Sequence, residues 1–122
     1  MSRWVDVNNA SRAGRRLARA RWCSSFLCRL RGLSLRRSLG EDEGLLLVES
    51  RPSRANAAIH MAGMLFPLGI VWIDGEGLVV DTGLARPWGI YIPSDPALYT
   101  LEAQPSVLEE VSRGDRLVFA DV

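Results

Sequence analysis

The stretch GIVWIDGEGLVVDTG, residues 69–83, decides the fold class of this chain of 122 residues. Two largely apolar runs, residues 69–74 and 77–83, flank the pair Gly75 and Glu76. The dipeptide Asp74-Gly75 is typical of the tight turns that join antiparallel strands. The stretch therefore predicts a β-hairpin, and we expect the segments on either side of it to add further strands.

Several other segments predict strands. Residues 44–50, GLLLVES, form a short continuous apolar run, which is typical of a buried strand. Residues 57–65 predict an extended segment that Gly63 interrupts. The arginine-rich residues 11–21 fit either a strand with alternating arginines or a mobile basic arm. The remaining candidate strands are residues 4–7, 98–103 and 116–122.

Helical features are confined to two segments. Apolar residues recur at helical spacing from Phe26 to Leu33, after two serines that can cap a helix N-terminus. We therefore expect a short amphipathic helix at residues 24–31 with its apolar face on the core. Residues 106–114 predict a second short helix or a turn.

These segments predict an α+β fold with a mostly antiparallel, strongly curved or barrel-like sheet of five to seven strands and one or two short helices. A chain of this length can bury a core as one domain, so we expect residues 1–122 to form a single domain. Within it, residues 1–10 could form a loosely held N-terminal segment.

Charge is distributed unevenly along the chain. Residues 1–40 contain ten arginines and one acid, whereas residues 41–122 contain five arginines and thirteen acids. The two parts can neutralise each other inside the fold, which we expect in preference to nucleic-acid binding. No apolar run is long enough for a membrane span, and none follows the N-terminal arginines as a signal peptide requires. These patterns predict a cytoplasmic protein.

The two cysteines, Cys23 and Cys28, are five positions apart. This spacing is not the CxxC of a metal site and indicates no disulfide framework. Since cytosolic thiols are normally reduced, we expect both to be ordinary small apolar residues.

Four stretches of the chain form a recognisable set. They are CRLRGLSLRRSLGEDEGLLLVE at residues 28–49, IHMAGMLFPLGIVWIDGEGLVVDTGLARPW at 59–88, YTLEA at 99–103 and GDRLVF at 114–119. Together they resemble the domain of unknown function 192 family. The resemblance covers roughly residues 8–119. It implies a compact, predominantly β single domain with little helix, and it supplies no activity, so no catalytic residue is carried over.

Some positions match the motif of this family and others depart from it. Ser34 stands where Met or Leu is common, and Leu68 and Gly69 replace a segment that commonly carries an acid after the proline. EAQPS, residues 102–106, replaces a Glu-Leu-Pro-Ala-Gly-like segment. The matching positions are Gly32, Leu33, Gly44, His60, Met64, Pro67, Asp74, Glu102, Gly114 and Asp115.

The candidate binding site lies around the only histidine, His60. With Met61 and Met64 it could offer soft metal ligands, but an extended strand would separate His60 from Met64 by about 13 Å and turn Met61 to the other face. We therefore expect no metal and no cofactor. The candidate surface is residues 60–67 together with the loop at residues 86–95. Its proposed ligand-binding residues are His60, Met64, Pro67, Trp88 and Glu102.

We expect a binding or accessory module for an unknown protein or small-molecule partner, because the chain has no nucleophile elbow, phosphate loop or paired metal motif. Two alternatives remain. One is a divergent hydrolase that uses His60 with a carboxylate such as Glu102, although Glu102 is most simply an outward-facing strand residue. The other is a basic accessory protein that contacts polyanions through residues Arg12–Arg37. The sequence leaves the oligomeric state open.

Overall fold

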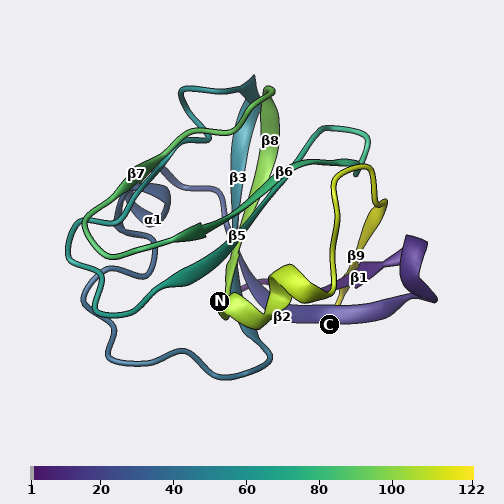
Figure 1. Cartoon of the computed structure of the whole chain (residues 1–122), viewed down its shortest axis with the longest axis horizontal. Coiled ribbons are helices and arrows are strands. Elements are labelled where there is room, and N and C mark those ends of the chain that lie inside the picture. Colours follow the sequence, from purple (N-terminus) through teal and green to yellow (C-terminus); the bar gives the residue numbers. More distant parts are fainter. Residues whose placement is uncertain (1) are drawn as a thin grey trace.

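The computed structural model describes residues 2–122 and is built around one curled sheet (Figure 1). Seven strands follow each other in the order β6-β5-β8-β3-β2-β1-β9, and only the β2–β3 pair is parallel. A mostly antiparallel, strongly curved sheet of seven strands is thus confirmed. The strands are β1 (Trp4–Asn9), β2 (Arg15–Cys23), β3 (Glu43–Ser53), β5 (Leu68–Ile73), β6 (Val79–Ala85), β8 (Ala97–Ala103) and β9 (Leu117–Asp121).

A smaller two-stranded sheet pairs β4 (Ile59–His60) with β7 (Ile90–Tyr91). The helical elements are one α-helix, α1 (Phe26–Arg31), and two 3₁₀ turns, η1 (Ala10–Arg12) and η2 (Pro105–Glu109). Figure 1 shows α1 and β7 together at one end of the molecule, with β1 and β9 toward the other. No helix in residues 2–122 is long and apolar enough to cross a membrane.

The hairpin predicted at residues 69–83 is confirmed as β5 and β6. Its turn is built by Asp74, whose Oδ1 accepts hydrogen bonds from the backbone N–H groups of Glu76 and Leu78. Gly77 follows at φ +90°, and a Cβ there would lie 2.8 Å from the carbonyl oxygen of Leu117. Only glycine lets this turn approach the start of β9 so closely.

Contacts between the same turn and β9 explain why the sheet curls. β6 and β9 are the two edge strands. Near the turn, Leu78 forms an isolated bridge with Arg116, and the N–H of Val79 donates to the carbonyl of Asp115 at 2.9 Å. The two edges therefore meet at one end and remain apart at the other, which gives a half-barrel.

The sheet is buried on both faces, which explains the continuous apolar runs in the sequence. All six residues of β5 are buried, and they alternate between two core clusters. Val71 and Ile73 face the cluster inside the curl, whereas Leu68, Ile70 and Trp72 face the cluster covered by β4, β7 and the adjoining loops.

The N-terminal residues differ from the expectation of a loosely held segment. Residues 4–9 form β1, which pairs with β2 on one side and with β9 on the other. Val5 and Val7 are fully buried in the core. The arginine-rich segment likewise forms strand β2 rather than a mobile arm, with Leu17 and Ala20 turned inward.

The helix prediction was right in position and wrong in orientation. α1 begins after Ser25, whose side chain accepts from the N–H of Cys28 as an N-cap. However, Phe26, Leu27 and Leu30 remain 68%, 74% and 54% exposed. The core below is filled by other elements, and of α1 only Cys28 packs against it.

Candidate functional site

A small enclosed pocket lies between the large sheet and the layer formed by α1 and β4. Its volume of about 40 Å³ has room for about three water molecules. Its walls come from residues 29–34, residues 56–61, Met64, and the strands β3 and β8. A wider hollow of about 350 Å³ shares part of this lining, including His60, and adds Phe26 of α1.

Glu102 stands at the floor of this pocket, in the middle of an apolar surface. It lies on β8 between Leu45 of β3 and Ile70 of β5, both fully buried cross-strand partners. Glu102 is 4% exposed, so the expectation of an outward-facing strand residue was wrong. Its Oε1 has no hydrogen-bond partner within residues 2–122, and burial raises the pKa of the Glu102 carboxyl to about 7.

Gly32 explains how the backbone reaches this carboxyl. The residue ends α1 at φ +53° and ψ −129°, a conformation that disfavours any side chain. A Cβ at this position would sit 3.4 Å from Glu102 Oε1. The glycine of the Arg31-Gly32-Leu33 motif thus lets the chain pass directly over the Glu102 side chain.

His60 and the two neighbouring methionines all border the pocket, although an extended strand would have separated them. The strand ends at His60, and a turn follows in which Gly63 has φ +76° and the N–H of Met64 donates to the carbonyl of Met61. Met61 and Met64 are therefore both buried. His60 is exposed, and its Nε2 donates to the carbonyl of Leu30 at 3.1 Å.

Three of the five proposed ligand-binding residues thus share one pocket, and two lie elsewhere. His60, Met64 and Glu102 line it together. Trp88 is 72% exposed and is absent from the lining, although its backbone N–H donates to Met61. Pro67 is exposed beside a separate hollow. Within residues 2–122, no three His, Cys, Asp or Glu side chains cluster as metal ligands would.

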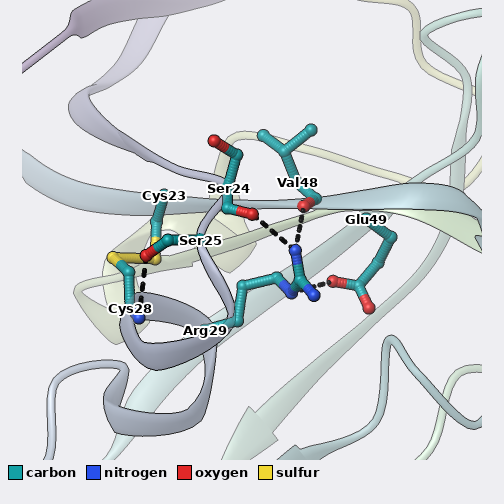
Figure 2. Close-up of a disulfide and its surroundings, with 7 residues drawn as sticks. All are labelled: Cys23, Ser24, Ser25, Cys28, Arg29, Val48 and Glu49. Atoms are coloured by element: carbon teal, nitrogen blue, oxygen red, sulfur yellow. Dashed lines mark hydrogen bonds and ion pairs between the residues drawn. A yellow bond between two sulfur atoms is a disulfide. The ribbon is translucent and has the colours of Figure 1, made fainter.

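The roof of the pocket, α1, is fastened by a disulfide and by polar contacts instead of apolar packing (Figure 2). Cys23 at the end of β2 is bonded to Cys28, with Cα atoms 5.7 Å apart, so the expectation of two free thiols was wrong. The Arg29 guanidinium donates to the carbonyls of Ser24 and Val48 and pairs with Glu49 at 3.0 Å. The cytoplasmic location stays a prediction, and a disulfide is more typical of oxidising compartments.

We expect the Cys23→Ala/Cys28→Ala variant to lose about 2 kcal/mol of unfolding free energy, the chain-entropy value for so short a loop. The measurement is urea unfolding with and without reductant. Reductant should lower the midpoint of the wild type and leave that of the variant unchanged. A wild-type midpoint that reductant does not move would contradict a structural role for this bond.

Most arginines of the N-terminal third are paired within the fold. Of the ten in residues 1–40, seven form ion pairs with carboxylates among residues 2–122. Arg19, for example, lies 2.9 Å from Asp6, and this contact lowers the pKa of the Asp6 carboxyl. The seven paired residues are Arg3, Arg12, Arg15, Arg16, Arg19, Arg29 and Arg36.

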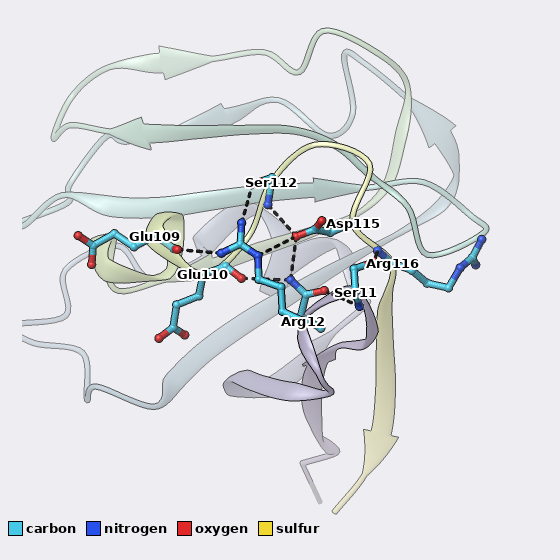
Figure 3. A network of polar contacts seen from close by, with 8 residues as sticks. Ser11, Arg12, Glu109, Glu110, Ser112, Asp115 and Arg116 are labelled. Carbon is cyan, nitrogen blue, oxygen red and sulfur yellow. Dashed lines mark hydrogen bonds and ion pairs between the residues drawn. The ribbon is translucent and has the colours of Figure 1, made fainter.

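A second polar cluster joins η1, η2 and the start of β9 (Figure 3). Asn9 is fully buried, and its Nδ2 donates to the carbonyl of Glu110 at 3.1 Å and to Asp115 Oδ2 at 2.9 Å. Arg12 adds donations to the carbonyl of Glu109 and the hydroxyl of Ser112. In the sequence, Asp115 stands out only as a position that matches the family motif, and Asn9 does not stand out. The hydrogen bonds of this cluster tie the end of β1 and η1 to the segment between η2 and β9.

Comparison with known proteins identifies relatives over most of the chain. The DUF192 family model, described as "Uncharacterized ACR, COG1430", matches residues 7–119. The UPF0127 protein TK1120 of Thermococcus kodakarensis is 37% identical over 93 residues, which are 75% of this chain and 58% of that protein. The UPF0127 protein PF1050 of Pyrococcus furiosus is 30% identical over 99 residues, or 80% and 83% of the two chains.

Two crystal structures share the fold. One, from Sinorhizobium meliloti 1021, is described as a "putative transcription regulator"; it has a TM-score of 0.79 and 26% identity and covers 98% of this chain and 94% of its own. The other, a protein of unknown function from Novosphingobium aromaticivorans, has a TM-score of 0.77 at 21% identity, with 94% and 83% covered. The chain spans about three-fifths of the length of its Thermococcus relatives. By the family model and by these relatives, the chain belongs to the uncharacterised DUF192 family, whose curated members carry the name UPF0127.

Proposed function

We propose that the domain is a binding module whose site is the pocket over Glu102. The observation that carries this proposal is a carboxyl group with an unpartnered oxygen, 4% exposed, on the floor of a cavity large enough for a few atoms. A buried polar atom without a partner costs free energy, so a group that satisfies it is stabilised there. A ligand that donates a hydrogen bond would do so.

The size of the two connected spaces limits the shape of this ligand. The inner pocket accepts only the tip of a molecule, such as a hydroxyl, amide or ammonium group. The wider hollow beside it is bordered by Phe26, Leu30 and His60 and by polar side chains such as Asn56, and it has room for a larger part of the molecule. His60 would stand at the passage between the two, and Met61 with Met64 would give the inner wall an adaptable apolar surface.

Four-carbon probes test this proposal. We expect 1-butanol, butyramide or butylammonium to shift the backbone amide resonances of residues 30–34 and 60–64, whereas butyrate, which offers no donor at neutral pH, should not. Butylammonium would bind more weakly as the pH falls below about 7, because Glu102 then becomes neutral. The three donor probes distinguish hydroxyl, amide and ammonium ligands.

The matched variants are Glu102→Gln, which removes the carboxylate, and Glu109→Gln, which alters an exposed glutamate outside the pocket. Glu102→Gln should weaken the preferred probe about ten-fold, the usual value of one hydrogen bond to a charged group. Glu109→Gln should bind as the wild type does. Equal binding by all three proteins, or no shift with any donor, would refute the assignment of this pocket.

The hydrolase hypothesis has less support. His60 and Glu102 do border the same pocket, and a carboxyl with a pKa of about 7 suits acid–base chemistry. Yet within residues 2–122 no hydroxyl or thiol hydrogen-bonds to His60, whose Nε2 is occupied by the carbonyl of Leu30.

The polyanion hypothesis for residues Arg12–Arg37 also has less support, because ion pairs neutralise most of these arginines.

A further inference from the structure

α1 and the β7 segment lie at the same end of the molecule (Figure 1), and both carry exposed large apolar side chains. The two elements are adjacent because His60 contacts the carbonyl of Leu30 through its ring and pairs with Ile90 through its backbone. We call this surface the apolar end. It comprises Phe26, Leu27 and Leu30 of α1 and Trp88, Ile90 and Ile92 of the β7 segment, each at least 54% exposed.

Strand alternation explains why the β7 segment exposes apolar side chains at the apolar end. Tyr91 turns inward and packs against the core cluster, so its neighbours Ile90 and Ile92 point outward. Leu35 and Leu65, on the adjoining loops, extend the same surface at 73% and 60% exposure. Isolated exposed apolar residues need no explanation, but a group of this size on one face marks an interaction surface.

The charge around the apolar end is mainly positive. The segments that build it, residues 24–40, 54–67 and 86–95, contain six arginines, one histidine and one acid, Asp95, which pairs with Arg113. Glu49 and Glu43, from the sheet, neutralise Arg29 and Arg36. The other four arginines are exposed and form no ion pair with any carboxylate of residues 2–122; they are Arg31, Arg37, Arg54 and Arg86.

We propose that the apolar end docks this domain on an anionic lipid surface. Leucine, isoleucine, phenylalanine and tryptophan side chains on a short helix and loop tips can enter the boundary between headgroups and acyl chains. The surrounding arginines pair with lipid phosphates while their aliphatic stems lie along the apolar boundary. A second copy of this chain is a poorer occupant, because it would bring the same unpaired arginines face to face.

Vesicle co-sedimentation tests the proposal. The chain should bind vesicles of mixed phosphatidylcholine and phosphatidylglycerol, bind phosphatidylcholine alone far more weakly, and lose affinity as salt is raised. Leu27→Ser/Trp88→Ser should reduce binding to the mixed vesicles by about 20-fold or more, because two large apolar side chains no longer enter the lipid. Arg31→Ala should cost about five-fold, the value of one basic residue near such a surface.

The control is Val118→Ser, which alters an exposed apolar residue on β9, away from the apolar end, and should bind as the wild type does. All variants change exposed side chains, so an unchanged urea midpoint would verify that each is folded. The proposal is overturned if the wild type does not bind the mixed vesicles, or if Leu27→Ser/Trp88→Ser binds as well as Val118→Ser. Sedimentation equilibrium that reveals a dimer abolished by the double substitution would assign the face to self-association instead.

Discussion

The Glu102→Gln variant is expected to be more stable than the wild type by about 3 kcal/mol at pH 8 and about equally stable near pH 4. At high pH the wild type must hold an ionised carboxylate on an apolar floor between Leu45 and Ile70. Glutamine has the same shape without the charge, so the variant avoids this desolvation. Below the pKa values of both states the carboxyl is neutral, and the two side chains become nearly equivalent.

The direction of this pH dependence follows from the number of protons that the folded and unfolded states bind. Burial raises the pKa of Glu102 to about 7 in the folded chain, from 4.5 in the unfolded one. Between these values the folded state holds one proton that the unfolded state lacks, so wild-type stability falls as the pH rises. The contribution of Glu102 is therefore fully present below about pH 4.5, declines up to about pH 7, and is constant above it.

Urea unfolding of both proteins at intervals from about pH 4 to about pH 8 measures the difference. Other shifted groups, such as Asp6, Glu43 and Glu49, titrate alike in both proteins and cancel when one free energy is subtracted from the other. Glu109→Gln, which removes a carboxyl at an exposed site, is the matched control. A flat difference for Glu102→Gln would mean that water reaches the carboxyl and that the pocket is not closed.

The sheet could be predicted from the sequence because its signals are local. The turn residues around Asp74 and the apolar run of β5 depend only on neighbouring positions, and both lie where expected. The strand order could not be predicted in this way, because β8 pairs with β3 and β5, and β9 pairs with β1, across long stretches of sequence. The sequence predicted a strongly curved sheet, but not the contacts between the turn and β9, about forty positions apart, that hold one end of the curl together.

Glu102 shows the limit of periodicity in predicting a site. Alternation in β8 correctly separates Leu101 from Glu102, and with Leu101 facing the core, Glu102 is assigned to solvent. This inference holds only for a sheet covered on one side. Here both faces are covered, so Leu101 and Glu102 are both buried, in different clusters of the structure. Glu102 is buried because the layer of α1 and β4 covers its face of the sheet, and the sequence did not predict the position of that layer.

The helix α1 shows a related limit. Spacing predicts the helix and its cap but not which side meets the core, because a six-residue helix can be attached by other means. In this chain the Cys23–Cys28 disulfide and the hydrogen bonds of Arg29 attach the helix to the sheet, and its apolar side chains are exposed to solvent. A spacing of five between cysteines cannot reveal this, since the bond depends on how β2 ends beside the helix.

The Asn9→Ala variant is expected to lose about 3 kcal/mol of unfolding free energy at neutral pH. Its Nδ2 is the donor that ties the end of β1 to the carbonyl of Glu110 and to Asp115, and its Oδ1 accepts from Ser11. Asn9 is fully buried, so water cannot readily replace these bonds. Urea unfolding measures the loss, and Asn8→Ala, on the same strand, should stay within about 0.5 kcal/mol of the wild type.

Asn9→Asp separates the hydrogen bond from the packing of the side chain. This substitution puts a carboxylate oxygen where Nδ2 stands, 2.9 Å from Asp115 Oδ2, and two carboxylates so close cannot both remain ionised. The hydrogen bond from Asn9 is the largest of the causes that lower the pKa of Asp115, so its replacement by a like charge should raise that pKa. Asn9→Asp should therefore be less stable than Asn9→Ala at pH 7 and regain part of the loss as the pH falls to about 4, because a protonated carboxyl then donates a hydrogen bond to the other. If the two variants were equally unstable at every pH, Asn9 would act by filling space, and the polar cluster would not be what joins β1 to the start of β9.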